Sequence, residues 1–144
     1  MNIKYEIVRD EIRKASLFLK EVYPDVACIN IHVFKSWVGG IRKENSYKIT
    51  PDDKLFLWVD CPNPDCTGTG FDLRFQIYES CRKRKILVGN VWCNGRESNE
   101  EKFYECCSRI VYMVECEFLD DNYPICESER NEALEKFNRL KEEL

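Results

Sequence analysis

Residues 103–118 read FYECCSRIVYMVECEF and are rich in the β-branched and aromatic side chains that favour strands. Their even-numbered positions are mostly apolar, whereas the odd-numbered positions carry most of the charges. Because successive side chains of a strand point to opposite faces of a sheet, this alternation predicts one long strand with a buried face and a wetter face. The fold is therefore expected to contain a sheet built around this strand.

Other segments of the chain are expected to complete that sheet. Residues 41–53 end in the turn signal TPDD and are expected to form a loop. Residues 71–85 fit a short helix capped by Thr69, although their alternation fits a strand almost as well. Three more segments have a β-prone composition and are predicted to be strands: VACINIHVFKSW (26–37), KLFLWVD (54–60) and ILVGNVWC (86–93).

Amphipathic helices are predicted at both ends of the chain. The first is expected to end before Pro24, because the residue before a proline avoids helical backbone. Its apolar stripe, at spacings of three and four, consists of Tyr5, Val8, Ile12, Ala15, Leu19 and Val22. The stripe of the second consists of Ala133, Phe137, Leu140 and Leu144. The sequence thus predicts one α+β domain over residues 1–144, with an antiparallel sheet flanked by terminal helices.

The composition excludes several classes of protein. With 144 residues, 44% apolar and 33% charged, the chain has the size and composition of one globular domain. It has no apolar run long enough to span a membrane and no apolar core of a secretory signal, so we expect a cytoplasmic protein without membrane contacts. Its net charge of −4 disfavours a general attraction to nucleic acid, although a local basic patch remains compatible with it.

The nine cysteines indicate a metal site rather than disulfides, because cytosolic thiols are kept reduced. Cys61 and Cys66 bracket the turn CPNPDC, which contains two prolines that restrict the unfolded loop. Gly68 and Gly70 follow and permit backbone conformations that direct N–H groups towards sulfur. This turn is expected to supply the first two metal ligands.

The other two ligands are expected from a hairpin formed by the last two strands. If Cys93 and Cys106 face each other across it, both thiolates can reach one ion at Zn–S distances of about 2.3 Å. Cys107, which points to the other strand face, and Cys81, at the end of the predicted helix, are alternatives to Cys106. Zinc suits four thiolates best, with iron as its competitor. The predicted structural zinc ligands are Cys61, Cys66, Cys93 and Cys106.

The remaining cysteines, Cys28, Cys116 and Cys126, are expected to be small buried apolar residues.

Three runs of this sequence resemble a pattern found in small uncharacterised bacterial proteins with a zinc-ribbon-like site of four cysteines. The runs are CPNPDCTGTGFDL (61–73), VWCNG (91–95) and CSRIVY (107–112). The resemblance covers about residues 47–118. It implies that Cys61, Cys66, Cys93 and one of Cys106 or Cys107 hold the metal, and it implies no activity.

The favoured function is a zinc-binding protein-interaction module, because a closed site of four thiolates leaves no coordination position for a substrate. Its partner is expected to be another protein. The candidate binding surface is the basic run Arg82, Lys83, Arg84 and Lys85. Alternatively, this run binds no partner, and its positive charges only complement the C-terminus of a helix.

Three other functions are less favoured. The basic run, with Tyr47, Tyr78 and Trp92, could bind nucleic acid, which the net acidity disfavours. The chain has one histidine, His32, and none of the zinc-hydrolase or deaminase motifs, which disfavours an enzyme, although a cysteine nucleophile paired with His32 stays open. A redox switch is the least favoured, because adjacent cysteines such as those at 106–107 rarely bridge without strain.

Overall fold

The computed structural model describes residues 3–37, 41–63, 66, 70–93, 96–99, 102–105, 108–120 and 126–144. Its helices are α1 (Ile3–Ala15), α2 (Leu19–Val22), α3 (Arg74–Lys83) and α4 (Glu127–Glu142). Its strands are β1 (Val26–Trp37), β2 (Ile41–Ile49), β3 (Trp58–Val59), β4 (Phe71–Asp72), β5 (Leu87–Trp92), β6 (Arg96–Asn99), β7 (Lys102–Glu105) and β8 (Arg109–Phe118).

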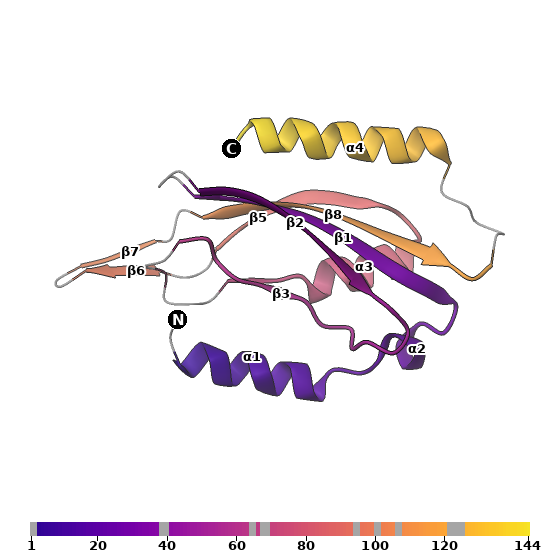
Figure 1. Cartoon of the computed structure of the whole chain (residues 1–144), viewed down its shortest axis with the longest axis horizontal. Coiled ribbons are helices and arrows are strands. Elements are labelled where there is room, and N and C mark those ends of the chain that lie inside the picture. Colours follow the sequence, from indigo (N-terminus) through magenta and orange to yellow (C-terminus); the bar gives the residue numbers. More distant parts are fainter. Residues whose placement is uncertain are drawn as a thin grey trace.

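A four-stranded antiparallel sheet with the order β2-β1-β8-β5 forms the centre of the molecule. Helix α4 covers one face of it, over β5 and β8, and α3 packs on β8 and β5 from the other side, where α1 and α2 also lie (Figure 1). Two small ladders, β3–β4 and β6–β7, complete the fold, and the β6–β7 hairpin projects from one end (Figure 1). This arrangement confirms the predicted α+β architecture with terminal helices.

Strands β1 and β8 form the core of the sheet. Ile29, Ile31 and Val33 of β1 have no exposed surface. They pair with Cys116, Val114 and Tyr112, which occupy the even-numbered face of β8 that the sequence predicted to be buried. The buried even-numbered face is therefore confirmed for Ile110, Val114 and Cys116, but the predicted wetter face is wrong at Val111, which is fully buried too. One continuous strand over 103–118 is also wrong for the described residues, because the chain forms two strands. Residues 106 and 107 lie outside the description.

The predicted loop at 41–53 is wrong for its first part, which is strand β2. This strand pairs with β1 from Ile29↔Ile49 to Trp37↔Ile41. The many charged residues of β2 make its sequence look like that of a loop, because an edge strand can carry charges on both of its faces. The turn predicted after it is present: the Asp53 carboxylate accepts hydrogen bonds from the backbone N–H and the hydroxyl of Thr50, at 2.8 and 2.7 Å.

The predicted N-terminal helix is interrupted after Ala15 and resumes as α2. At the interruption, Leu17 accepts a hydrogen bond from the backbone N–H of Leu55, and Phe18 forms a bridge with Lys54. These contacts divert the chain from the helix. Of the predicted apolar stripe, Leu19 is fully buried, whereas Val8 is 40% exposed, so the stripe does not pack as one continuous face.

The other predicted elements are largely confirmed, with shorter boundaries. The strand expected at 54–60 is limited to β3, which pairs with β4. Helix α3 is present, but its first N–H group, at Arg74, is bonded by the Asp72 carboxylate at 3.1 Å; the predicted cap, Thr69, lies outside the described residues. Strand β5 and helix α4 agree with the predictions for 86–93 and 127–144. Within the described part of the chain, no helix has the length and apolar character required to cross a membrane.

Candidate metal centre

Three of the predicted ligands come together in the structure. The Sγ atoms of Cys61, Cys66 and Cys93 all lie within 4.8 Å of one another, and those of Cys66 and Cys93 are 3.7 Å apart. In a tetrahedral site with Zn–S bonds of about 2.3 Å, the sulfur atoms are about 3.8 Å apart. The thiols therefore have the spacing that a metal ion with thiolate ligands requires.

The ends of two strands position these cysteines. Cys61 follows β3 closely, and Cys93 directly follows β5. The N–H group of Cys66 donates a hydrogen bond to the carbonyl oxygen of Asn63 at 3.2 Å. The N–H group of Cys93 donates to the carbonyl oxygen of Ser108 at 3.0 Å, which ties it to the start of β8. The cluster thus joins segments far apart in the sequence.

The environment of the cluster suits a bound cation. Cys66 and Cys93 are buried and Cys61 is half-buried. The pKa of Cys61 is raised, first by its hydrogen bond with the Cys93 thiol and then by burial, while contacts with Ser108 and the Asn63 backbone oppose the rise. Buried thiolates need a compensating positive charge, which a metal ion supplies at the site itself.

Helix α1 is attached beside the first cysteine. The Arg9 guanidinium forms an ion pair with Asp60 at 2.8 Å and lies 5.4 Å from the centre of the Trp58 ring. This contact ties α1 to the residue that precedes Cys61 in the sequence. Sequence reasoning missed Arg9, because 51 residues separate it from Asp60 and no local motif connects them.

The hairpin register differs from the predicted one. Strand β5 pairs with β8 so that Trp92 faces Arg109, and Cys93 bonds to Ser108 rather than facing Cys106. The β6–β7 hairpin keeps the same register, with Asn99 opposite Lys102. The assumed pairing of Cys93 with Cys106 is therefore wrong by two residues. Cys106 and Cys107, the two main candidates for the fourth ligand, lie outside the described residues.

Cys81, the third candidate, lies in a different sulfur contact. Its Sγ atom is 3.1 Å from that of Cys116, and both residues are buried between α3 and β8. The contact with Cys116 and burial both raise the pKa of Cys81. Cys28 and Cys116 are buried as predicted, but Cys126 is exposed, because it precedes the first turn of α4 at the surface.

The basic run at the end of α3 is largely paired with carboxylates of the same chain. Arg82 and Lys83 both bind the Glu79 carboxylate, at 2.7 and 2.9 Å. Arg84, with a positive φ of 52° at the C-cap, binds two aspartates, Asp25 and Asp120. These contacts agree with the alternative that the run closes the helix, and they leave Lys85 as the residue that faces a groove beside β5.

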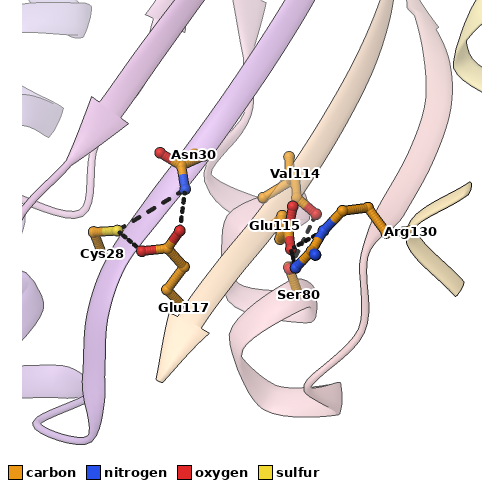
Figure 2. A network of polar contacts seen from close by, with 7 residues as sticks. All are labelled: Cys28, Asn30, Ser80, Val114, Glu115, Glu117 and Arg130. Atoms are coloured by element: carbon orange, nitrogen blue, oxygen red, sulfur yellow. Dashed lines mark hydrogen bonds and ion pairs between the residues drawn. The ribbon is translucent and has the colours of Figure 1, made fainter. Parts of the chain in front are cut away.

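Cys28 and His32 lie on one face of β1 but do not form a catalytic pair. The His32 Nδ1 atom is 2.9 Å from the Ser46 hydroxyl. His32 is four positions after Cys28 along the strand, a distance of about 13 Å. The Cys28 thiol instead donates to the Glu117 carboxylate at 3.0 Å, and Asn30 contacts the same carboxylate (Figure 2).

Cys28 is therefore expected to be a poor nucleophile. Burial, followed by the contact with Glu117, raises its pKa to about 11, which lowers its thiolate fraction at pH 8 about a hundredfold relative to an ordinary cysteine. Alkylation followed by peptide mass spectrometry should modify the exposed Cys126 long before Cys28. Glu117→Gln, which removes the charge, should speed the reaction of Cys28. Equal rates for Cys28 and Cys126 in the unmodified protein would contradict this assignment.

The fold and the cluster together define an α+β domain with a cysteine site that could hold a metal ion. No family model matches the sequence, and neither a curated protein nor a solved structure gives a match. The resemblance to small bacterial zinc-ribbon-like proteins therefore rests on the pattern of residues alone.

Proposed function

We propose that this chain is a zinc protein in which one structural ion holds together a protein-interaction domain. The observation that carries the proposal is the spacing of the three sulfur atoms, within 4.8 Å of one another. Thiolates are soft ligands, and zinc is the common divalent ion that four thiolates suit best. The ion would connect the turn at 61–66 to the point where β5 and β8 begin to pair.

The fourth ligand in this proposal is Cys106 or Cys107. Cys107 directly precedes Ser108, and Cys106 is two positions before it. The carbonyl oxygen of Ser108 accepts a hydrogen bond from the Cys93 N–H group, so both cysteines are within two residues of a contact with the cluster. Four thiolate ligands would leave no open position on the ion, which is the arrangement of structural rather than catalytic zinc.

A role in binding another protein is supported by the residue that precedes Cys93. Trp92 is 56% exposed, and the Arg109 guanidinium lies 4.8 Å from the centre of its ring. Tryptophan and arginine are enriched among the residues that dominate binding at protein interfaces. In this proposal, the zinc centre fixes the end of β5 and thereby the position of this side chain.

Metal analysis of the purified protein tests the zinc centre. We expect one zinc per chain, and loss of that zinc in Cys61→Ser, Cys66→Ser and Cys93→Ser, because each change removes one thiolate ligand. Cys126→Ser is the matched control, since Cys126 is exposed and outside the cluster, and it should keep its zinc.

The same measurement identifies the fourth ligand and the ion. Of Cys106→Ser and Cys107→Ser, one should lose the metal and the other should retain it. Stoichiometric iron would contradict the choice of zinc, and a well-folded protein without metal, after expression and purification with zinc present, would contradict the centre itself.

A further inference from the structure

The two edges of the central sheet differ in how they are protected. The outer strand β2 carries charged side chains along its length, including Arg42, Lys43, Glu44 and Lys48. The opposite outer strand, β5, reads LVGNVW and carries none. Charged side chains on edge strands prevent pairing with other chains. In the part of the chain that the structure describes, no strand covers the outer edge of β5.

The free edge of β5 presents backbone hydrogen-bonding groups in a regular pattern. Because Cys93 bonds to Ser108, it and every second residue before it direct their N–H and C=O groups to β8. The alternate residues, Val88, Asn90 and Trp92, therefore direct theirs outwards. These groups form the template that another antiparallel strand requires.

A groove runs beside this edge, between β5 and α4. Its volume is about 370 Å³, and Ile86 and Val88 line it from the sheet. Glu129, Glu132 and Lys136 line it from the helix. The floor of the groove at Ile86, Val88 and Ala133 is thus apolar, whereas Lys85 before β5 adds a positive charge and the helical wall carries charges of both signs.

The two sides of α4 differ in whether their charged residues form ion pairs with the rest of the chain. On the side away from the groove, Arg130 binds Glu115 at 2.7 Å and Lys141 binds Glu44 at 3.4 Å. These pairs fasten the helix to its own sheet.

On the groove side, the charged residues of α4 are arranged symmetrically. Glu129, Glu132 and Lys136 are followed at helical spacing by the exposed Arg139, so the intervals are three, four and three. None of these four residues forms an ion pair with another described residue. The order acidic, acidic, basic, basic is complementary to itself when two such helices run antiparallel.

We propose that the free edge of β5 binds the β5 edge of a second copy of this chain, which makes one continuous sheet across a two-fold axis. The axis passes beside Val88, so that the outward backbone groups of Val88 pair with those of Val88 in the second copy, and Ile86 pairs with Asn90. This inference deepens the proposed protein-interaction role and rests on it, with the chain itself as the partner.

The position of α4 along β5 agrees with this axis. Arg130 contacts Glu115 near the start of β5, and the carbonyl oxygen of Glu143 accepts a hydrogen bond from Arg109, which faces Trp92. Helix and strand therefore run in the same direction, at rises of about 1.5 and 3.3 Å per residue. The point of α4 beside Val88 is then close to residue 134, the midpoint of the symmetric charges.

An axis at this point brings opposite charges together across the interface. Glu132 of one chain meets Lys136 of the second copy, and Glu129 meets Arg139. Because α4 lies over both β5 and β8, and neighbouring strands are about 4.8 Å apart, the two α4 helices are about 10 Å apart, the usual packing distance of helices. A second copy therefore fills the groove and neutralises its wall, which an unrelated extended peptide would not do.

Sedimentation of the full chain tests this proposal. We expect a mass twice the 17.1 kDa of one chain. Glu129→Lys with Glu132→Lys makes the groove side of α4 wholly basic, and Lys136→Glu with Arg139→Glu makes it wholly acidic. Each double variant alone should dimerise at least about tenfold more weakly, because like charges oppose each other across the axis. A mixture of the two should recover dimers that contain one chain of each.

A second variant tests the backbone pairing independently of α4. Asn90→Pro removes one outward N–H group and leaves the bonds from β5 to β8 in place, and it should also yield monomers. Lys48→Glu on the β2 edge is the matched control and should stay dimeric. A monomeric unmodified protein, or dimers that persist in both double variants alone, would overturn the proposal. Zinc measured in the same samples separates the two proposals: a monomer with one zinc per chain contradicts only the dimer.

Discussion

Removal of zinc by a chelator is expected to lower the free energy of unfolding of the purified protein by about 4 kcal/mol, the stabilisation that a ligand gives at about a thousand times its Kd. Cys66 and Cys93 belong to the same buried cluster as Val59 and Phe71, so loss of the ion would release the turn at 61–66 from the core itself. Urea unfolding, followed by tryptophan fluorescence with and without chelator, measures the difference.

The Cys66→Ser variant provides the control for this experiment. Because it lacks a ligand, it should already have the lower stability, and the chelator should change it no further. The Cys126→Ser variant should respond as the unmodified protein does, since its side chain is exposed at the start of α4. An equal loss of stability in Cys66→Ser and in the unmodified protein would show that the chelator acts elsewhere.

The candidate site could be predicted from the sequence to the extent that its geometry is local. Cys61 and Cys66 are held by a short turn, and Cys93 ends a strand whose composition is plainly β-prone, so these three were found. The partner of Cys93 depends on the hairpin register, which the connection between the strands sets. Nothing in the sequence of that connection distinguished Cys106 from Ser108 as the residue opposite Cys93.

The fold shows the same division between local and distant causes. Strand β1 and helix α4 were predicted closely because one pattern extends along each of them. Strand β2 was missed because an edge strand has few buried positions, and its sequence is as polar as that of a loop. The break in the N-terminal helix arises from pairing with residues 54 and 55, and the periodicity of the helix itself contains no sign of it.

Gly70→Ala is expected to cost about 2–3 kcal/mol of folding stability. Gly70 has a φ of +63°, a conformation that a residue with a Cβ atom adopts only with strain. An added Cβ would also lie 2.6 Å from the carbonyl oxygen of Val59 and 2.8 Å from the indole nitrogen of Trp58. The backbone of β3 would therefore have to move.

This movement should also weaken metal binding, because β3 leads directly to Cys61. Gly89→Ala is the matched control: the atoms nearest to its added Cβ would belong to the Tyr112 side chain, with the hydroxyl oxygen at 2.6 Å, and its φ is not in the left-handed region. It should cost less stability and leave zinc affinity unchanged. Unfolding in urea and zinc competition with a chelator measure both effects, and equal zinc affinities for the two variants would mean that the β3–β4 ladder does not position Cys61.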